Sequence, residues 1–105
     1  MMARFDIFNN PFAAERVHTP FVLDVQNDHL GSLATRVVIP LRTPKGFGRP
    51  ANSLNPMLAV EGKSVVLDTA SLAPVPTHLL RRPVARADKS SGEVFDALDT
   101  LFGSY

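Results

Sequence analysis

The chain contains no cysteine and no tryptophan among its 105 residues. The lack of cysteine excludes disulfides, thiol catalysis and cysteine-ligated zinc. No apolar run approaches the roughly 18 residues of a membrane-spanning helix, and the start of the chain, MMARFDIFNN, lacks the apolar core of a signal peptide. Eleven basic and ten acidic residues leave a formal charge of +1, which argues against binding to DNA, RNA or anionic lipid mainly through bulk charge. We therefore expect one cytoplasmic domain that binds no membrane.

Nine prolines are spread along the chain up to Pro83. Because proline lacks the backbone N–H and clashes with the preceding helical turn, short strands and loops are expected before that residue. Apolar alternation and β-branched runs predict strands at 3–8, 21–25, 36–41, 57–60 and 64–67, with a weaker candidate at 79–87. The Glu-Gly-Lys sequence at 61–63 predicts a hairpin turn. The remaining long loop, 42–56, is expected to be functional or mobile.

Only the C-terminal segment follows a helical period, with apolar residues at 94, 98, 101 and 102. Ser90 and Glu93 fit a capping box at its start, and Gly103 lies where a left-handed residue ends a helix. The spacing predicts a helix over about 91–102. The predicted fold is mainly β, a small barrel or curled antiparallel sheet over about 1–88 with this helix appended, in a single domain 1–105.

Patterns typical of catalysis or metal binding are missing. The three histidines, His18, His29 and His78, have no acidic or histidine partner at helical spacing, so we expect no metal and no cofactor. No serine lies in a G-x-S-x-G elbow, and no glycine-rich loop has the strand–helix context that binds phosphate. This favours a binding protein over an enzyme.

Two clusters of basic residues leave alternatives open. The first interleaves an aromatic ring with cations, as in a nucleic-acid contact or a solvated loop, and consists of Lys45, Phe47 and Arg49. The second fits an edge strand protected by charge or a site for an acidic partner peptide, and consists of Arg81, Arg82 and Arg86.

Three segments occur in the order FVLDVQNDHL at 21–30, RVVIPL at 36–41 and LDTASLAPVP at 67–76. Together with the C-terminal helix they resemble the CcdB family of toxins from bacterial toxin–antitoxin modules. The resemblance covers nearly the whole chain, apart from the loop at 43–53. It implies an SH3-like barrel with an appended C-terminal helix, assembled as a homodimer.

The resemblance also implies a function without catalysis or cofactor. Proteins of this family poison DNA gyrase by binding its A subunit and trapping the complex while its DNA is cleaved. A CcdA-like antitoxin, whose disordered acidic C-terminal segment wraps the toxin, displaces it from gyrase, and the pair represses its own operon. DNA is thus contacted only through gyrase or the antitoxin. The arginines at 81, 82 and 86 are the candidate antitoxin-binding residues.

By the same resemblance, the gyrase-contacting surface lies at the end of the C-terminal helix and in the loop after the D-V-Q-x-D motif. In ungapped register, the helix end contributes Asp99 and Phe102, and the family's terminal Trp-Gly-Ile corresponds to Gly103, Ser104 and Tyr105. The loop contributes His29 and Leu30, on a family pair of apolar contacts. The chain therefore departs from the family at the absent tryptophan and at the histidine.

Two alternative functions remain open at this point. One is an endoribonuclease toxin on the same barrel, for which the sequence spacing marks no Arg–Asp/Glu–Thr/Ser set. The other is a CcdB-fold protein that is inactive on gyrase and serves in antitoxin binding and operon autoregulation.

Overall fold

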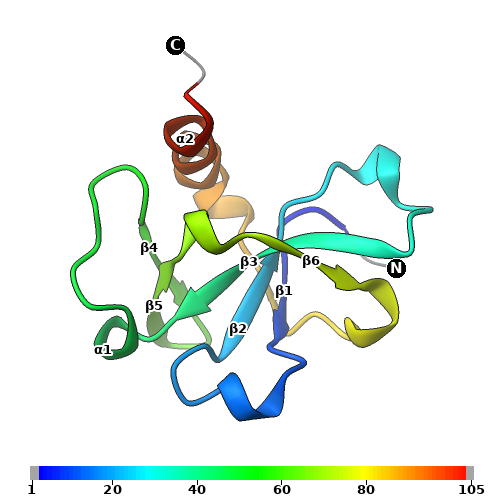
Figure 1. The fold of residues 1–105 in the computed structure, drawn as a ribbon, viewed down its shortest axis with the longest axis horizontal. Coiled ribbons are helices and arrows are strands. Elements are labelled where there is room, and N and C mark those ends of the chain that lie inside the picture. Colours follow the sequence, from blue (N-terminus) through cyan, green and yellow to red (C-terminus); the bar gives the residue numbers. More distant parts are fainter. Residues whose placement is uncertain (1–2, 104–105) are drawn as a thin grey trace.

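The computed structural model describes residues 3–103, which form an antiparallel sheet curled into a barrel, with a helix at the C-terminal end (Figure 1). Within these residues the strand order is β4-β5-β3-β2-β1-β7, and β6 pairs with β3 off this path. The strands are β1 (Asp6–Asn9), β2 (Phe21–Asp24), β3 (Thr35–Arg42), β4 (Met57–Val60), β5 (Lys63–Leu67), β6 (Ala73–Pro76) and β7 (Ala85–Arg86). The helices are α1 (Pro44–Phe47) and α2 (Ser91–Phe102), and short 3-10 turns link several elements. The predicted fold class is confirmed.

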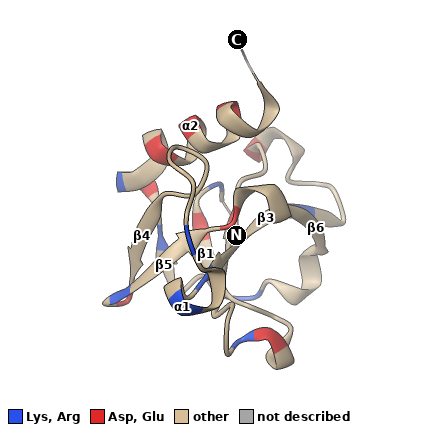
Figure 2. Ribbon diagram, turned by 60° about the vertical axis from the view of Figure 1, so that its left-hand side comes forward, with Lys and Arg blue, Asp and Glu red and all other residues tan. Residues whose placement is uncertain are grey.

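The apolar core lies inside the curled sheet. Strand β3 pairs with β2 along one edge, and along the other edge it pairs first with β6 and then with β5. The fully buried side chains of the core come from β1 to β5 and from α2, and include Ile7, Leu23, Ile39, Leu41, Val60, Leu67, Val94 and Ala97. Because Val94 and Ala97 are the buried residues of α2, the helix packs that face on the barrel and turns the opposite face outward (Figure 2).

The first strand starts later than predicted. Residues 3–5 form a turn, and β1 begins at Asp6. Phe5 has a φ of 74°, in the left-handed region that bulky residues rarely adopt. Its N–H donates to the Asp24 carbonyl (2.7 Å), and its carbonyl accepts from the Ala87 N–H (2.9 Å). These contacts hold the turn in place against a strain of about 1–3 kcal/mol.

The predicted hairpin is confirmed between β4 and β5. Val60 and Lys63 are paired, which leaves a two-residue loop of Glu61 and Gly62. Both loop residues have positive φ, 51° and 78°, as the right-handed twist of the strands requires of such short turns.

A short helix, α1, lies in the segment predicted as a loop. The expectation that no helix precedes Pro83 is wrong here because Pro44 occupies the first turn, where a missing N–H costs no hydrogen bond. The Thr43 hydroxyl caps this turn by accepting from the Gly46 N–H (3.0 Å).

The candidate strand at 79–87 is wrong for most of its length. Only β7 pairs, with Asp6 and Ile7 of β1, and Pro83 before it cannot donate to a ladder. In contrast, β6 was not among the predicted strands, and it contains Pro74 and Pro76. The two prolines are tolerated because β6 pairs with β3 alone and its other edge needs no donor.

Helix α2 has the predicted bounds, but its N-terminus lacks the predicted capping box. The Ser90 side chain makes no capping hydrogen bond, so the capping box is wrong, and a 3-10 turn at Asp88–Ser90 leads into the helix instead. Its end is confirmed, since Gly103 is left-handed (φ 66°, ψ 57°) and its N–H donates to the Asp99 carbonyl (2.8 Å). Within residues 3–103, no helix has the length and apolar character needed to cross a bilayer.

Candidate partner-binding site

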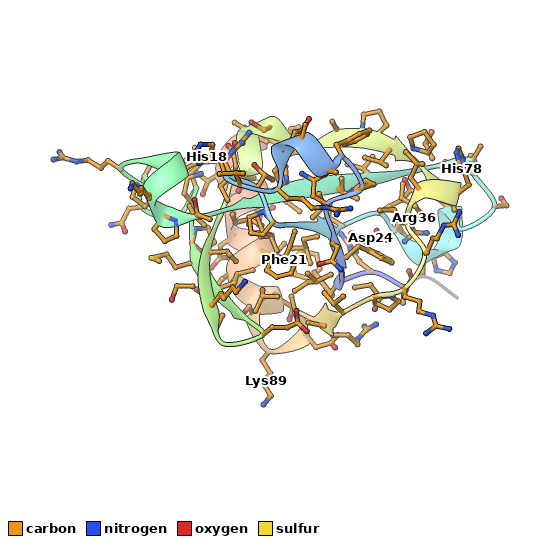
Figure 3. The ribbon with its side chains drawn as sticks, turned by 90° about the horizontal axis from the view of Figure 1, so that it is seen from below. His18, Phe21, Asp24, Arg36, His78 and Lys89 are labelled. Atoms are coloured by element: carbon orange, nitrogen blue, oxygen red, sulfur yellow. The ribbon has the colours of Figure 1, made fainter. Side chains whose placement is uncertain are left out.

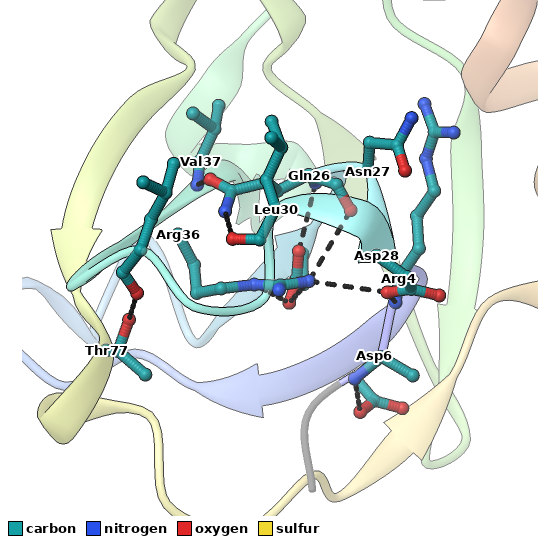
Figure 4. A network of polar contacts seen from close by, with 12 residues as sticks. Arg4, Asp6, Gln26, Asn27, Asp28, Leu30, Arg36, Val37 and Thr77 are labelled. Carbon is teal, nitrogen blue, oxygen red and sulfur yellow. Dashed lines mark hydrogen bonds and ion pairs between the residues drawn. The ribbon is translucent and has the colours of Figure 1, made fainter.

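The D-V-Q-x-D segment at 24–28 folds around a buried arginine, Arg36 of β3 (Figure 4). Arg36 is 2% exposed, and its Nε and Nη2 each lie 2.8 Å from the Asp24 carboxylate. Its Nη2 also donates to the Gln26 carbonyl (3.4 Å) and lies 3.6 Å from the Asp28 carboxylate. One buried cation therefore holds three positions of the motif together.

Gln26 ties the same segment to β3 through its side chain. Its Oε1 accepts from the Val37 N–H (3.0 Å), and its Nε2 donates to the Leu30 carbonyl (3.1 Å). These bonds support the 3-10 turn at Asp28–Leu30, called the 28–30 turn below. The side chains of His29 and Leu30 are exposed on this turn.

The electrostatics of the network depend on Asp24. Burial raises the pKa of the Asp24 carboxyl above its ordinary value, because removal from water penalises the charged form. The Gln26 N–H, which donates to Asp24 (3.0 Å), and the Arg36 guanidinium act on the pKa in the opposite direction. The charged carboxylate is therefore costly at this position and is supported by Arg36.

The outward side of α2 carries three residues spaced about one turn apart, Phe95, Asp99 and Phe102, called the α2 stripe below. Phe102 is 69% exposed and Phe95 is 41% exposed. Asp99 is also exposed between them. Large solvent-exposed aromatic side chains on one face of a helix are typical of a surface that binds another protein.

Arg4 connects the 28–30 turn with the α2 stripe. Its backbone N–H donates to Oδ1 of Asp28 (2.8 Å), and its guanidinium carbon lies 4.8 Å from the centroid of the Phe95 ring. The Phe5 ring meets Phe95 edge to face at 5.5 Å, and the same guanidinium lies 5.6 Å from the Phe5 centroid. A cation over an aromatic ring is attracted to the negative face of that ring. The structure thus joins, through one residue, the two regions predicted to contact gyrase.

A family model described as CcdB protein matches residues 4–103, nearly the whole chain. The chain belongs to the CcdB family. This confirms the resemblance drawn from the three sequence segments, and it indicates the toxin component of a toxin–antitoxin module. No curated protein matches the chain.

The three arginines predicted to bind a CcdA-like antitoxin have different surroundings. Arg86 is already engaged with carboxylates, because it pairs with Asp6 and with Asp88 (2.6 Å) and donates to the Arg4 carbonyl (3.1 Å). Arg86 in turn lowers the pKa of the Asp88 carboxyl through their hydrogen bond. A guanidinium that already pairs with two carboxylates has fewer free N–H groups with which to bind an acidic peptide.

Arg81 and Arg82 are exposed, and they line an open pocket of about 310 Å³ together with Arg16. The Arg16 Nε donates to the Asn10 carbonyl (2.6 Å). The Arg16 guanidinium forms no ion pair with a carboxylate among the described residues. The cationic surface therefore consists of Arg16, Arg81 and Arg82. Arg16 was not predicted to belong to this surface, because it lies far from Arg81 and Arg82 in the chain.

The histidines do not gather. His18 and His78 lie toward opposite sides of the molecule (Figure 3), and within residues 3–103 no group of three or more acidic or histidine side chains is placed to hold a metal ion. The first basic cluster spans the end of α1, because Lys45 and Phe47 belong to the helix and Arg49 follows it.

Of the residues predicted for the CcdB-family tail, Gly103 ends α2, whereas Ser104 and Tyr105 lie outside the described residues. Arg4 and Phe95 were not predicted to belong to the site. A signal for Phe95 was present, because it lies seven residues before Phe102 and off the core positions 94, 98 and 101. No sequence pattern marked Arg4, whose role depends on the turn around Phe5.

Proposed function

We propose that this CcdB-family toxin inhibits DNA gyrase by binding the A subunit and trapping the complex while its DNA is cleaved. One geometric observation carries the proposal beyond family membership. The α2 stripe and the 28–30 turn are joined through Arg4, so that one partner protein can contact both regions at once. Such a poison needs a complementary surface and no catalytic group.

The energy of protein association is concentrated in a few side chains, and aromatic residues are common among them. Phe102 has the largest exposed fraction of the phenylalanines with water-exposed rings, 69% against 45% for Phe12 and 41% for Phe95. We therefore assign Phe102 as the central anchor, with Asp99, His29 and Leu30 beside it. Gly103, Ser104 and Tyr105 extend this surface in the proposal.

A CcdA-like antitoxin is the proposed neutralising partner. Its disordered acidic segment fits the exposed cations at Arg81 and Arg82, because charge-assisted bonds to carboxylates are strongest where no internal carboxylate competes. Arg86 is kept as a weaker member of this set, since Asp6 and Asp88 already bind it.

A homodimer is the proposed assembly. Several large apolar side chains are exposed on the described residues, and association of two copies can bury part of this apolar surface. Light scattering at micromolar concentration is expected to give about twice the chain mass. A mass that stays at one chain over a wide concentration range contradicts this assembly.

The deciding experiment incubates the purified protein with gyrase, supercoiled DNA and ATP, and in parallel with total RNA. Linear DNA that appears after protein denaturation, with intact RNA, supports the proposal. The matched variants are Phe102→Ala and Phe12→Ala, since both remove an exposed ring but Phe12 precedes the 3-10 turn at Ala13–Glu15, whose segment lies at the opposite end of Figure 1 from α2. Only the first is expected to abolish cleavage.

Other results of the same experiment identify the alternatives. Fragmented RNA with unchanged DNA overturns the gyrase proposal in favour of an endoribonuclease. No change in either nucleic acid, with tight binding of an acidic antitoxin peptide, overturns it in favour of a protein that acts only in antitoxin binding and operon control.

A further inference from the structure

The 28–30 turn and α2 belong to different parts of the chain. The turn is supported from beneath by Arg36 and Gln26, and the helix is fixed to the barrel by Val94 and Ala97. A partner that contacts both must meet them at one relative position, because each side chain that has to shift on binding reduces the affinity. The residue that links them is therefore as important as the contact residues themselves.

Arg4 makes this link with two separate groups. Its main-chain N–H donates to Asp28 at the start of the turn (2.8 Å), while its guanidinium stacks on the Phe95 ring of the helix (4.8 Å). Asp28 also faces Arg36 (3.6 Å), so the link continues into the buried network (Figure 4). A chain of contacts thus runs from the helix ring to the core of the motif.

The surroundings of Arg4 differ from those of the paired arginines. Arg36, Arg42 and Arg86 each bind a carboxylate within residues 3–103, whereas Arg4 forms no ion pair with a described residue. Its Nε is buried and has no hydrogen-bond partner among the residues described. A buried unpaired N–H is unfavourable. The contacts that hold this side chain in place are therefore those with the Phe95 and Phe5 rings, since it has no charge partner among the described residues.

We propose that Arg4, clamped between Asp28 and Phe95, is a positioning residue that makes the 28–30 turn and the α2 stripe a single rigid contact surface. The inference rests on the proposed function for the identity of the partner, the gyrase A subunit. The clamp itself is a property of the free toxin and is measured without any partner. Phe95 acts in the clamp through its ring, and Phe102 remains the residue that contacts the partner.

The first test measures amide hydrogen exchange in the free protein at His29, Leu30 and Gly31. Arg4→Gln keeps the main-chain bond to Asp28 but removes the cation from Phe95, and Phe95→Ala removes the ring. Either change is expected to speed exchange in the turn about two- to fivefold, which corresponds to one exposed cation–π contact. The double variant is expected to match the single ones, because both remove the same contact.

Two controls separate positioning from a general loss of stability. Phe102→Ala removes an equally aromatic residue of the same helix that is not stacked on Arg4, and exchange in the turn is expected to stay unchanged. Arg4→Lys keeps a cation that stacks on the ring and is expected to restore part of the protection. Unchanged exchange in Phe95→Ala, or equal acceleration in Phe102→Ala, overturns the clamp.

The second test measures binding to the purified gyrase A subunit. In the unmodified protein, Leu30→Ala and Phe102→Ala are expected to be coupled, so that the double variant loses less affinity than the product of the two single losses. In the Arg4→Gln background the losses are expected to multiply independently. Independent losses in both backgrounds overturn the single-surface inference. Failure of every form to bind the A subunit overturns the proposed function, and the exchange measurements then decide the clamp alone.

Discussion

The guanidinium of Arg36 lies 2.8 Å from the carboxylate of Asp24, and both side chains are shielded from water, at 2% and 0% exposure. A buried pair of this kind contributes little over an apolar pair, but removal of one partner leaves the other charge without compensation. Arg36→Met is therefore expected to lower the free energy of unfolding by about 3–5 kcal/mol. Urea denaturation followed by circular dichroism measures the loss. Arg82→Met, at an exposed position, is the control and is expected to stay within about 0.5 kcal/mol.

The titration of Asp24 gives a second prediction. Because burial raises its folded pKa above 3.8, the contribution of Asp24 to stability is full below that value and is lost as the pH rises through the folded pKa. Asp88 has the opposite sign, since Arg86 lowers its pKa, and its contribution is lost as the pH falls.

Carbon-13 NMR of the side-chain carboxyl measures the pKa of Asp24 directly. A value above 3.8 is expected in the native protein. An Asp24 carboxyl that titrates below 3.8 contradicts the dominance of burial over the Arg36 contact.

The hairpin between β4 and β5 offers a stabilising substitution. Glu61 has a φ of 51° and is followed by Gly62, a pair of conformations for which Asn-Gly is the preferred sequence. Glu61→Asn is expected to raise the free energy of unfolding by about 0.5–1 kcal/mol, because asparagine tolerates the left-handed region better than glutamate. Thermal and urea melts measure the gain. Ser64→Asn, in the adjacent strand, is the control and is expected to give no gain.

The tail prediction concerns residues 103–105. Their removal is expected to abolish growth inhibition and leave the fold intact, because they follow α2 and the buried residues of that helix are Val94 and Ala97. Plating efficiency reports the first effect, and far-UV circular dichroism reports the second. A truncated protein that still stops growth removes the tail from the proposed gyrase contact.

The elements that the sequence predicted well are those whose signal is local. The period of α2, the glycine that ends it and the two-residue hairpin all depend on neighbours in the chain, and each is present in the structure. The errors arise where contacts with residues distant in the sequence determine the local conformation. Strand β6 tolerates two prolines only because β3 accepts it as an edge, and Phe5 takes a strained turn because Asp24 and Ala87 bind its main chain.

The candidate site shows the same division. His29, Leu30, Asp99 and Phe102 were predicted through resemblance and are exposed where a partner can reach them. The contacts of Arg4 that link the two regions were not predictable, because Arg4 and Asp28 are distant in sequence and meet only through the turn at residues 3–5. Arg86 was predicted to bind the antitoxin because of its charge. Its ion pairs with Asp6 and Asp88 could not be predicted from the sequence.

The left-handed Phe5 links backbone strain to the side-chain packing beneath the proposed contact surface. A glycine there would relieve the strain, but it would also remove the ring that packs against Phe95 and Arg4. The phenylalanine therefore balances backbone strain against side-chain packing, since its ring also lies against the apolar core. By contrast, the exposed residues at 29, 30 and 102 carry no such strain, so substitutions at these positions alter the proposed contact surface at little cost to folding.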